Sequence, residues 1–272
     1  MTDLSKDKLP STHSLILARD GGVLKIWLNR PEAKNALSKE MTDELNLVLD
    51  NVRDDRSIRT IVLRGSGGVF CAGGDIKSFK TDMQMVDADE VAKSNRSFGN
   101  LLIKLNEQPQ VVIILVEGAA IGGGLGLACV ADVTLVTADA QFRLSETSLG
   151  IPPAQIAPFV TERVGLTQAR RLMLTGARFN GQEALTLGIA HTVATDAADL
   201  EAQCEIILGQ IKACAPEANA VTKGILFETL RRPRGEALDF ASRGFAQCML
   251  SSEGREGIAA FVEKRPASWI KK

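Results

Sequence analysis

Tyrosine is absent from the 272 residues of this chain, and histidine occurs only twice, at His13 and His191. Neither histidine has a second histidine or a carboxylate at metal-ligand spacing, which argues against a catalytic metal. A Ser-His-Asp triad is disfavoured by the same shortage of histidine. Acid–base chemistry in this chain must therefore depend on carboxylates or lysines.

Cysteine pairs are missing as well. The five cysteines are an odd number, they are widely scattered, and none forms a C-x-x-C motif. Such a pattern gives neither a disulfide framework nor a redox motif. We therefore expect most of the cysteines to be reduced residues of the core.

An excess of charge is also missing, because 32 Lys and Arg residues face 33 Asp and Glu residues. Without a field of one sign, neither nucleic acid nor an anionic membrane is an expected partner. No apolar run approaches the ~18 residues of a transmembrane helix, and residues 1–14 lack the apolar stretch of a signal peptide. We expect a cytoplasmic protein whose partner is a small molecule.

The patterns that are present predict an α/β core. Residues 14–28 read as a hairpin, and residues 60–64, 111–116 and 133–136 as buried strands, with more strand character over 141–146. Helical stretches between these strands, one of them capped by Ser38, favour parallel strands with crossover helices. From about Leu200 the strands disappear and helical runs dominate. We predict a polar tail over 1–13, an α/β core over 14–199 and a helical region over 200–272.

Two glycine-rich loops, residues 70–77 (FCAGGDIK) and 120–128 (AIGGGLGLA), each follow a predicted buried strand. A dinucleotide fingerprint fails, because Leu127 stands where the third glycine belongs. Loops at the carboxyl ends of neighbouring strands can direct free backbone N–H groups into one crevice. The N–H groups of Gly74 and Gly123 would then form an oxyanion hole. The alternative is that the glycines only permit tight turns, which two such loops in one chain make less attractive.

Six motifs now carry a family resemblance. They are LNRPEAKNALSKEM (28–41), FCAGGDIK (70–77), GAAIGGGLGLACVADV (118–133), LSETSLGI (144–151), LTGARFNGQEALTLGIAHTV (174–193) and AFVEKRPASW (260–269). Across nearly its whole length the chain resembles the crotonase (enoyl-CoA hydratase/isomerase) superfamily. The resemblance implies an α/β fold, a crotonase-like spiral of ββα units with a helical C-terminal trimerisation region. It also implies a homotrimer or a dimer of trimers that binds an acyl-CoA thioester, with coenzyme A as part of the substrate and no separate cofactor or metal.

The resemblance also assigns catalytic groups. The Gly74 and Gly123 N–H groups would hold the thioester oxygen, and Glu146 matches one of the two catalytic glutamates of the hydratases. The position of the second glutamate is occupied by Gly126. A single glutamate is compatible with hydration and equally with moving a proton between the α- and γ-carbons, as in a Δ3,Δ2-enoyl-CoA isomerase.

Further positions are implied as substrate contacts. Lys34, Lys77 and Lys264 would meet the phosphates of coenzyme A, and Phe261 would pack near the adenine of a neighbouring subunit's ligand. A second carboxylate on the substrate would need a cation or a donor, for which Lys77, Arg143 and Gln155 are the candidates. The complete set of expected substrate contacts is Lys34, Ala36, Ala72, Asp75, Ile76, Lys77, Gln155, Phe261 and Lys264.

The run LSETSLGIPPAQIAPFV (144–160), together with Gly126, is similar to bacterial hydratases of branched glutaconyl thioesters. Their substrates are 3-methylglutaconyl-CoA from leucine breakdown and isohexenylglutaconyl-CoA from acyclic terpene breakdown. Residues 153–159 could instead be a choice of loop packing. A role of another class, as a non-catalytic RNA- or acyl-CoA-binding protein, is disfavoured for RNA by the net charge of −1 and the lack of an RNP-like aromatic pair.

Overall fold

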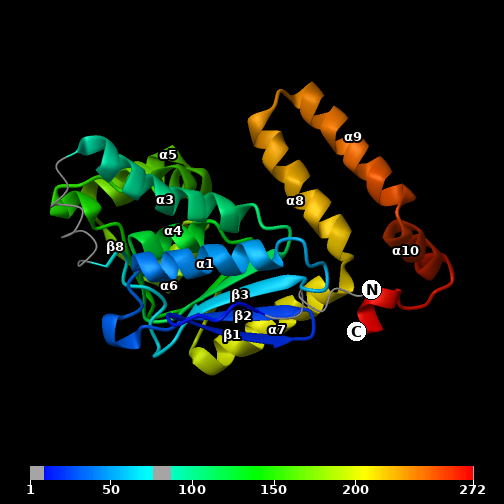
Figure 1. Cartoon of the computed structure of the whole chain (residues 1–272), viewed down its shortest axis with the longest axis horizontal. Coiled ribbons are helices and arrows are strands. Elements are labelled where there is room, and N and C mark those ends of the chain that lie inside the picture. The colour runs from blue at the N-terminus through cyan, green and yellow to red at the C-terminus, as the bar shows by residue number, and fades with distance from the viewer. Residues whose placement is uncertain (1–8, 76–86, 272) are drawn as a thin grey trace.

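A mixed six-stranded sheet lies at the centre of the molecule, which the computed structural model describes over residues 9–75 and 87–271 (Figure 1). β1 pairs antiparallel with β2, and each later pair of neighbours is parallel. In sheet order the strands are β1 (Leu15–Asp20), β2 (Val23–Leu28), β3 (Thr60–Gly65), β4 (Val111–Val116), β6 (Val133–Thr137) and β9 (Thr192–Ala194). The predicted hairpin and the predicted parallel strands are confirmed.

Helix α1 (Lys39–Val52) covers one face of this sheet, where it packs beside α3 (Ala88–Asn106). The predicted cap is confirmed, because the Ser38 hydroxyl accepts a hydrogen bond from the Met41 N–H at 3.2 Å. Apolar side chains at helical spacing along α1, Leu45 and Leu49 among them, are buried in the main hydrophobic core.

Helix α7 (Ala197–Ala213) covers the opposite face of the sheet. Its apolar stripe, which includes Leu200 and Cys204, packs on side chains such as Val62 and Leu135 that point to this face. Because side chains alternate along a strand, the same strands supply both cores. The sheet is therefore covered on both faces, as its parallel strands require.

A second, three-stranded sheet has the order β5-β7-β8, with β5 (Ala119–Ile121) parallel to β7 (Gln141–Arg143) and β7 antiparallel to β8 (Arg178–Phe179). The strand character predicted over 141–146 is only partly right. The strand stops at Arg143, because its partner β8 has two residues, and a 3₁₀ turn η2 (Glu146–Leu149) follows. The remaining elements of this region are α4 (Gly123–Cys129), α5 (Ala157–Thr175), α6 (Gly181–Thr186) and the 3₁₀ turn η1 (Pro31–Ala33).

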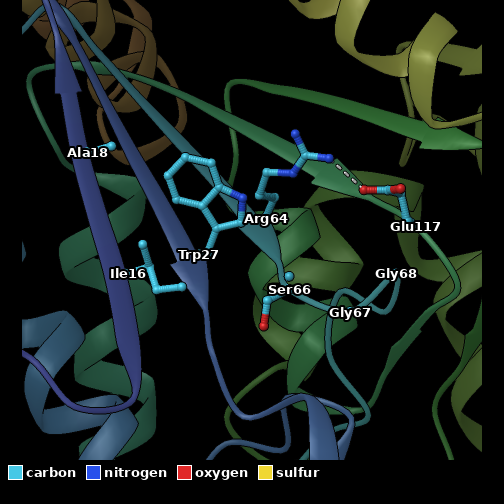
Figure 2. A pocket seen from close by; sticks show the side chains of 9 residues that line it. Ile16, Ala18, Trp27, Arg64, Ser66, Gly67, Gly68 and Glu117 are labelled. Carbon is cyan, nitrogen blue, oxygen red and sulfur yellow. Dashed lines mark hydrogen bonds and ion pairs between the residues drawn. The ribbon is translucent and has the colours of Figure 1, made fainter.

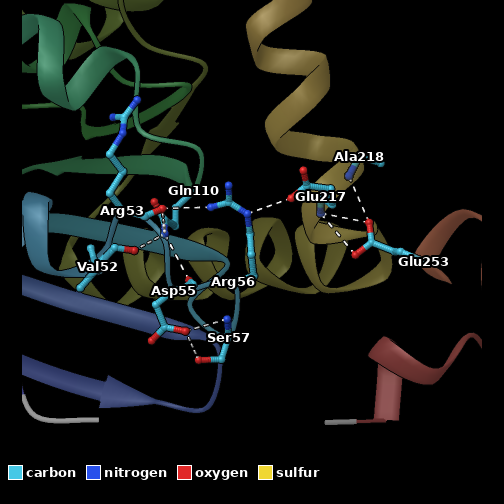
Figure 3. A network of polar contacts seen from close by, with 9 residues as sticks. All are labelled: Val52, Arg53, Asp55, Arg56, Ser57, Gln110, Glu217, Ala218 and Glu253. Atoms are coloured by element: carbon cyan, nitrogen blue, oxygen red, sulfur yellow. Dashed lines mark hydrogen bonds and ion pairs between the residues drawn. The ribbon is translucent and has the colours of Figure 1, made fainter. Parts of the chain in front are cut away.

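Three C-terminal helices stand away from the two sheets in Figure 1. They are α8 (Pro216–Arg231), α9 (Arg234–Leu250) and α10 (Ser252–Val262), followed by the 3₁₀ turn η3 (Ser268–Lys271). Figure 3 shows how the start of α8 is held: the Arg56 guanidinium pairs with Glu217 at 2.9 Å, and Glu253 accepts from the N–H groups of Glu217 and Ala218 at 3.0 and 3.1 Å. Among the described residues, no helix is both long and apolar enough to span a bilayer.

A buried lysine fastens α8 to the core. Lys223 is 8% exposed, and its ammonium donates to the carbonyl oxygens of Gln108 and Gln110 at 2.7 and 2.6 Å and to the Asp132 carboxylate at 2.5 Å. Burial lowers the pKa of Lys223, and the Asp132 charge opposes that shift. The ammonium thus satisfies three acceptors at the point where the C-terminal helices leave the core.

We predict that Lys223→Met lowers the free energy of unfolding by about 3 kcal/mol, because it removes the donor to the carbonyl oxygens of Gln108 and Gln110 and the counter-charge of Asp132. Urea denaturation followed by circular dichroism measures the change. The control is Lys104→Met, which breaks an exposed pair with Asp50 and should change stability by about 1 kcal/mol or less. Equal effects of the two substitutions would contradict this role of Lys223.

Candidate active site

The two glycine-rich loops interlock. Cys71 and Ala120 form a parallel bridge, in which the Cys71 N–H donates to Ala119 O at 2.9 Å and the Ile121 N–H donates to Cys71 O at 3.0 Å. A Cβ on Gly124 would lie 2.7 Å from Cys71 O, closer than real Cβ atoms come to a carbonyl oxygen. The glycines therefore permit more than tight turns, since they let one loop lie against the other.

The Gly74 N–H is left without an acceptor by a second bridge. Leu37 donates to Gly73 O at 2.7 Å and accepts from the Asp75 N–H at 3.1 Å. In a parallel bridge the residue between these two neighbours directs its own N–H away from the partner. The Gly74 N–H therefore points to the side of the loop on which Cys71 meets β5, and it donates to no described residue.

The Gly123 N–H is the second predicted donor. Helix α4 begins at Gly123, so this N–H has no acceptor within the helix. A Cβ at Gly123 would lie 2.9 Å from Leu37 Cδ1 and 3.2 Å from Phe98 Cζ. Apolar side chains from the loop before α1 and from α3 thus border the start of α4, where water is partly excluded.

The Glu146 carboxylate lies over the residue just before α4. A Cβ on Gly122 would come within 2.5 Å of Glu146 Oε1, and the Gly122 N–H donates to Arg143 O at 2.9 Å, which joins β7 to this point. Glu146 Oε2 is buried, and no described residue donates a hydrogen bond to it. Burial raises the pKa of Glu146, although backbone N–H groups at residues 145 and 146 oppose the shift. A buried carboxylate with a free oxygen and a raised pKa suits a group that takes up and returns a proton.

The position of the missing second glutamate is filled by apolar side chains. A Cβ on Gly126 would lie 2.3 Å from Ile156 Cγ2 and 3.7 Å from Leu102 Cδ1. Ile156 is 3% exposed, so it has little room to move aside. A carboxylate at residue 126 would therefore require the chain entering α5 to be repacked, and among the described residues Glu146 faces this space without a second acid.

The expected coenzyme A segments are brought together in part. Lys34 O accepts from the Ala72 N–H at 3.0 Å, and the Arg30 guanidinium donates both to Ala36 O at 2.8 Å and to the Asp75 carboxylate at 2.9 Å. The predicted contacts on residues 34–36 and 72–75 are therefore neighbours. The predictions for Ile76 and Lys77 lie outside the described residues.

Phe261 and Lys264 are placed elsewhere in the chain. Phe261 lies on α10 with 85% of its surface exposed, and Lys264 follows that helix. In Figure 1 α10 lies at the opposite side of the molecule from α3 and β8. One subunit by itself does not bring these two residues to the glycine loops.

The two described candidates for a second substrate carboxylate differ in their surroundings. The Arg143 Nε donates to Gly176 O at 3.0 Å, so this guanidinium supports the turn before β8. The Gln155 amide instead donates to Asn95 Oδ1 at 2.9 Å, and its Oε1 lies against Gly99 of α3. Gln155 is therefore the candidate beside the space in front of Glu146, because the next residue, Ile156, covers Gly126.

A pocket of about 490 Å³ lies on the other face of the main sheet (Figure 2). Trp27 and Ile16 border it, and Arg64 pairs with Glu117 at 2.8 Å beside it. The cation and the acid neutralise each other, and Arg64 also pairs with Glu201 of α7 at 2.6 Å. Among the described residues that line this pocket, Glu117 is the acid and it is paired, unlike Glu146 beside the glycine loops.

The model of the enoyl-CoA hydratase/isomerase family matches residues 18–272. The chain belongs to the enoyl-CoA hydratase/isomerase family. It is 30% identical to a probable enoyl-CoA hydratase of Bacillus subtilis (strain 168), over 93% of this chain and 97% of that protein. It is 29% identical to the short-chain-enoyl-CoA hydratase of Clostridium acetobutylicum, over 95% of this chain and 98% of that protein. The protein is thus an enzyme of the enoyl-CoA hydratase type.

Solved structures of the family agree with this fold. Pseudomonas aeruginosa AtuE is 53% identical and superposes with a TM-score of 0.93 over 95% of this chain and 100% of AtuE. An enoyl-CoA hydratase/isomerase from Marinobacter aquaeolei is 44% identical, with a TM-score of 0.91 over 94% of this chain and 99% of that one. The expected crotonase fold with its C-terminal helices is confirmed.

Sequence reasoning missed several residues around the site. Gly122, Phe98 and Ile156 received no role, although they set the position of Glu146 and the walls around α4. The signal for Gly122 was the GGG run itself, in which three successive glycines each meet a different neighbour. No sequence signal indicated Phe98 and Ile156, because an apolar residue that borders an active site cannot be distinguished in a sequence from one that packs in the core.

We predict that Gly122→Ala lowers kcat by about 10²-fold, because the added Cβ displaces Glu146 and small misplacements of catalytic groups have costs of this size. The backbone at Gly122, with φ of +50° and ψ of −116°, also disfavours a side chain. Steady-state kinetics with the best enoyl-CoA substrate measures the effect. In the control Gly209→Ala on α7, where no atom lies within 4 Å of the new Cβ, kcat should stay at the wild-type value. A wild-type kcat for Gly122→Ala would show that Glu146 does not depend on this contact.

Proposed function

We propose that the protein adds water reversibly to a branched, carboxylated 2-enoyl-CoA of the glutaconyl type, either isohexenylglutaconyl-CoA or 3-methylglutaconyl-CoA. The observation that supports it most is the single buried Glu146 carboxylate with a free oxygen, set against the start of α4. The resemblance of residues 144–160 to hydratases of branched glutaconyl thioesters gives the substrate class. Terpene or leucine catabolism would be the setting.

In the proposed reaction Glu146 is both base and acid. Its Oε2 takes a proton from water as the oxygen adds to the β-carbon, and the carboxyl then returns that proton to the α-carbon. The negative charge that develops on the thioester oxygen would be held by the N–H groups of Gly74 and Gly123, where each donor of such a hole contributes roughly 3–4 kcal/mol in measured systems. Water is consumed and no other reactant is needed.

The lack of a second acid fits a branched substrate. In a two-glutamate hydratase the second carboxylate would help hold the water, and here Ile156 occupies that space. A substituent on the β-carbon makes this carbon tertiary, so it bears developing positive charge better and needs less activation of the water. The same apolar side chain would also favour an alkyl branch over a polar group.

Isomerisation of a 3-enoyl-CoA is the second candidate. The same observation favours it, because one buried carboxylate is sufficient to move a proton from the α- to the γ-carbon without water. The two reactions differ in whether water is incorporated, which product analysis measures directly. A non-catalytic acyl-CoA-binding role would give binding without turnover of any thioester.

We predict that Glu146→Gln lowers kcat by about 10²–10⁴-fold, the usual weight of a general acid–base group, while thioester binding changes little. In the wild type the acid limb of the kcat/KM profile should lie above the usual range of a glutamate, because burial raises the pKa of Glu146 and the ionised form must accept the first proton. The limb should be absent in Glu146→Gln. Full activity of this variant would contradict the role of Glu146.

The substrate is decided by incubation with crotonyl-, 3-hexenoyl-, 3-methylglutaconyl- and isohexenylglutaconyl-CoA in H₂¹⁸O, with products identified by mass spectrometry. Incorporation of ¹⁸O into a glutaconyl thioester supports the proposal. Migration of the double bond in 3-hexenoyl-CoA, with no water added to either glutaconyl thioester, would establish the isomerase instead. AtuE, assayed in parallel, provides a structurally matched comparison.

We further propose a homotrimer or a dimer of trimers in which Lys34, Ala36, Ala72 and Asp75 of one subunit, with Ile76 and Lys77, meet the coenzyme A of their own site. Phe261 and Lys264 would reach a neighbour's ligand from α10. Leu230, Phe245 and Leu250 on α8 and α9 are each nearly 70% exposed. Such exposed apolar side chains support an interface with other subunits at these helices.

We predict a trimeric or hexameric mass in light scattering at micromolar concentration, because an isolated subunit would leave these apolar faces in water. Leu230→Asp combined with Phe245→Asp should shift the mass toward the monomer and weaken coenzyme A binding together with it. Leu166→Asp, a change of an exposed leucine on α5, is the control and should leave the mass unchanged. A monomeric wild type would contradict the proposed assembly.

A further inference from the structure

Two polar side chains, Arg96 of α3 and Gln155 just before α5, lie close to Gly99. Gly99 is a buried glycine in the middle of this helix, where glycine costs about 1 kcal/mol relative to alanine. A Cβ at this position would lie 2.1 Å from Gln155 Oε1 and 2.9 Å from Arg96 Nη1. Because Gly99 has no side chain, the side chains of Arg96 and Gln155 can both lie close to its Cα.

The sequence neighbours of Gly99 and Gln155 contact the helix α4, which begins at the predicted donor Gly123. Phe98, next to Gly99, contacts the Gly123 position, and Leu102 faces Gly126 one turn further along α4. Gln155 is followed by Ile156, the residue that covers Gly126. In Figure 1 the helices α3, α4 and α5 lie together at the same end of the molecule. An acyl chain that leaves the oxyanion hole along α4 would thus run toward Phe98 and Ile156, the sequence neighbours of Gly99 and Gln155.

The donors of Arg96 and Gln155 are not used up by the protein. Within residues 9–75 and 87–271, the Arg96 guanidinium has neither an ion pair nor a hydrogen bond. Gln155 Nε2 donates one N–H to Asn95 Oδ1 at 2.9 Å, so its second N–H stays available. The Gln155 atom that lies toward Arg96 at Gly99 is the amide oxygen Oε1, so the guanidinium is the group suited to a carboxylate there, since its planar N–H donors match the two carboxylate oxygens.

We infer that Arg96, with Gln155 beside it over Gly99, binds the second carboxylate of a dicarboxylic enoyl-CoA substrate. The inference rests on the proposed function and names the residues that give it selectivity. Arg96 supplies the cation, Gln155 a further donor, and Gly99 the room for both. Asn95 acts as a positioning residue, because its side-chain oxygen orients the Gln155 amide.

The test uses the purified full-length protein and two unreactive ligands of equal acyl length, glutaryl-CoA and valeryl-CoA. Isothermal titration calorimetry gives the ratio of their Kd values, and kinetics gives the ratio of kcat/KM for 3-methylglutaconyl-CoA and 3-methylcrotonyl-CoA. We expect the wild type to prefer the carboxylated member of each pair. In Arg96→Met both preferences should fall by about 10- to 100-fold, because a hydrogen bond to a charged group contributes roughly 1.5–3 kcal/mol and 1.4 kcal/mol is tenfold.

Gly99→Ala is the second variant. Its new Cβ would push the Gln155 amide aside, and both preferences should fall several-fold through an increase in KM for the carboxylated substrate rather than a loss of kcat. Arg170→Met, which removes an exposed cation on α5, is the matched control for net charge and should leave both ratios unchanged.

Each outcome has a distinct meaning. An Arg96→Met variant that keeps the wild-type preference, or that weakens both members of a pair equally, overturns the inference while the proposed hydratase function stands. A wild type that hydrates neither glutaconyl thioester overturns the proposed function. If that wild type also binds glutaryl-CoA no better than valeryl-CoA, the carboxylate site is overturned with it.

Discussion

The contact between the two glycine-rich loops is the constraint on which the site depends. The bridge between Cys71 and Ala120 fixes the loop after β3 against the chain after β4, and Gly124 permits the backbones to approach. Burial raises the pKa of the Cys71 thiol to about 12, so this side chain stays a neutral packing group at the contact. Both N–H donors lie within a few residues of the bridge, and their directions follow from it.

The buried position of the Glu146 carboxylate is imposed by the elements around it. A carboxylate with a buried, unpaired oxygen disfavours folding in its ionised form. Gly122, with a backbone conformation that suits glycine, allows Glu146 to lie against α4, and the β5–β7 pairing holds the chain on either side. The buried, unpaired oxygen of Glu146 is thus a local cost in folding free energy, which the apolar burial on both faces of the parallel sheet offsets.

An apolar wall, formed by Ile156 and Leu102, lies against Gly126 on the helix that begins beside Glu146. Ile156 fills the position where a second acid would stand, and the preceding Gln155 lies against α3. Under the proposed function, this one short segment would determine both how water is activated and which substituent of the substrate is met. A change in this segment would alter both properties at once, which explains how members of one fold can act on different thioesters.

The sequence by itself determined the hairpin, the parallel strands, the capped helix α1 and the family, because apolar periodicity and glycine motifs are local patterns. It also indicated Glu146 and the two donor glycines. The strand predicted over 141–146 was too long, because the length of β7 depends on its two-residue partner β8. The sequence assigned no role to Phe98, Gly99 or Arg96, since only tertiary packing brings α3 beside residues 155 and 156. Local sequence patterns thus indicated Glu146 and the two glycines. The apolar side chains around them, Phe98, Leu102 and Ile156, come from segments distant in sequence, and no local pattern encodes such contacts.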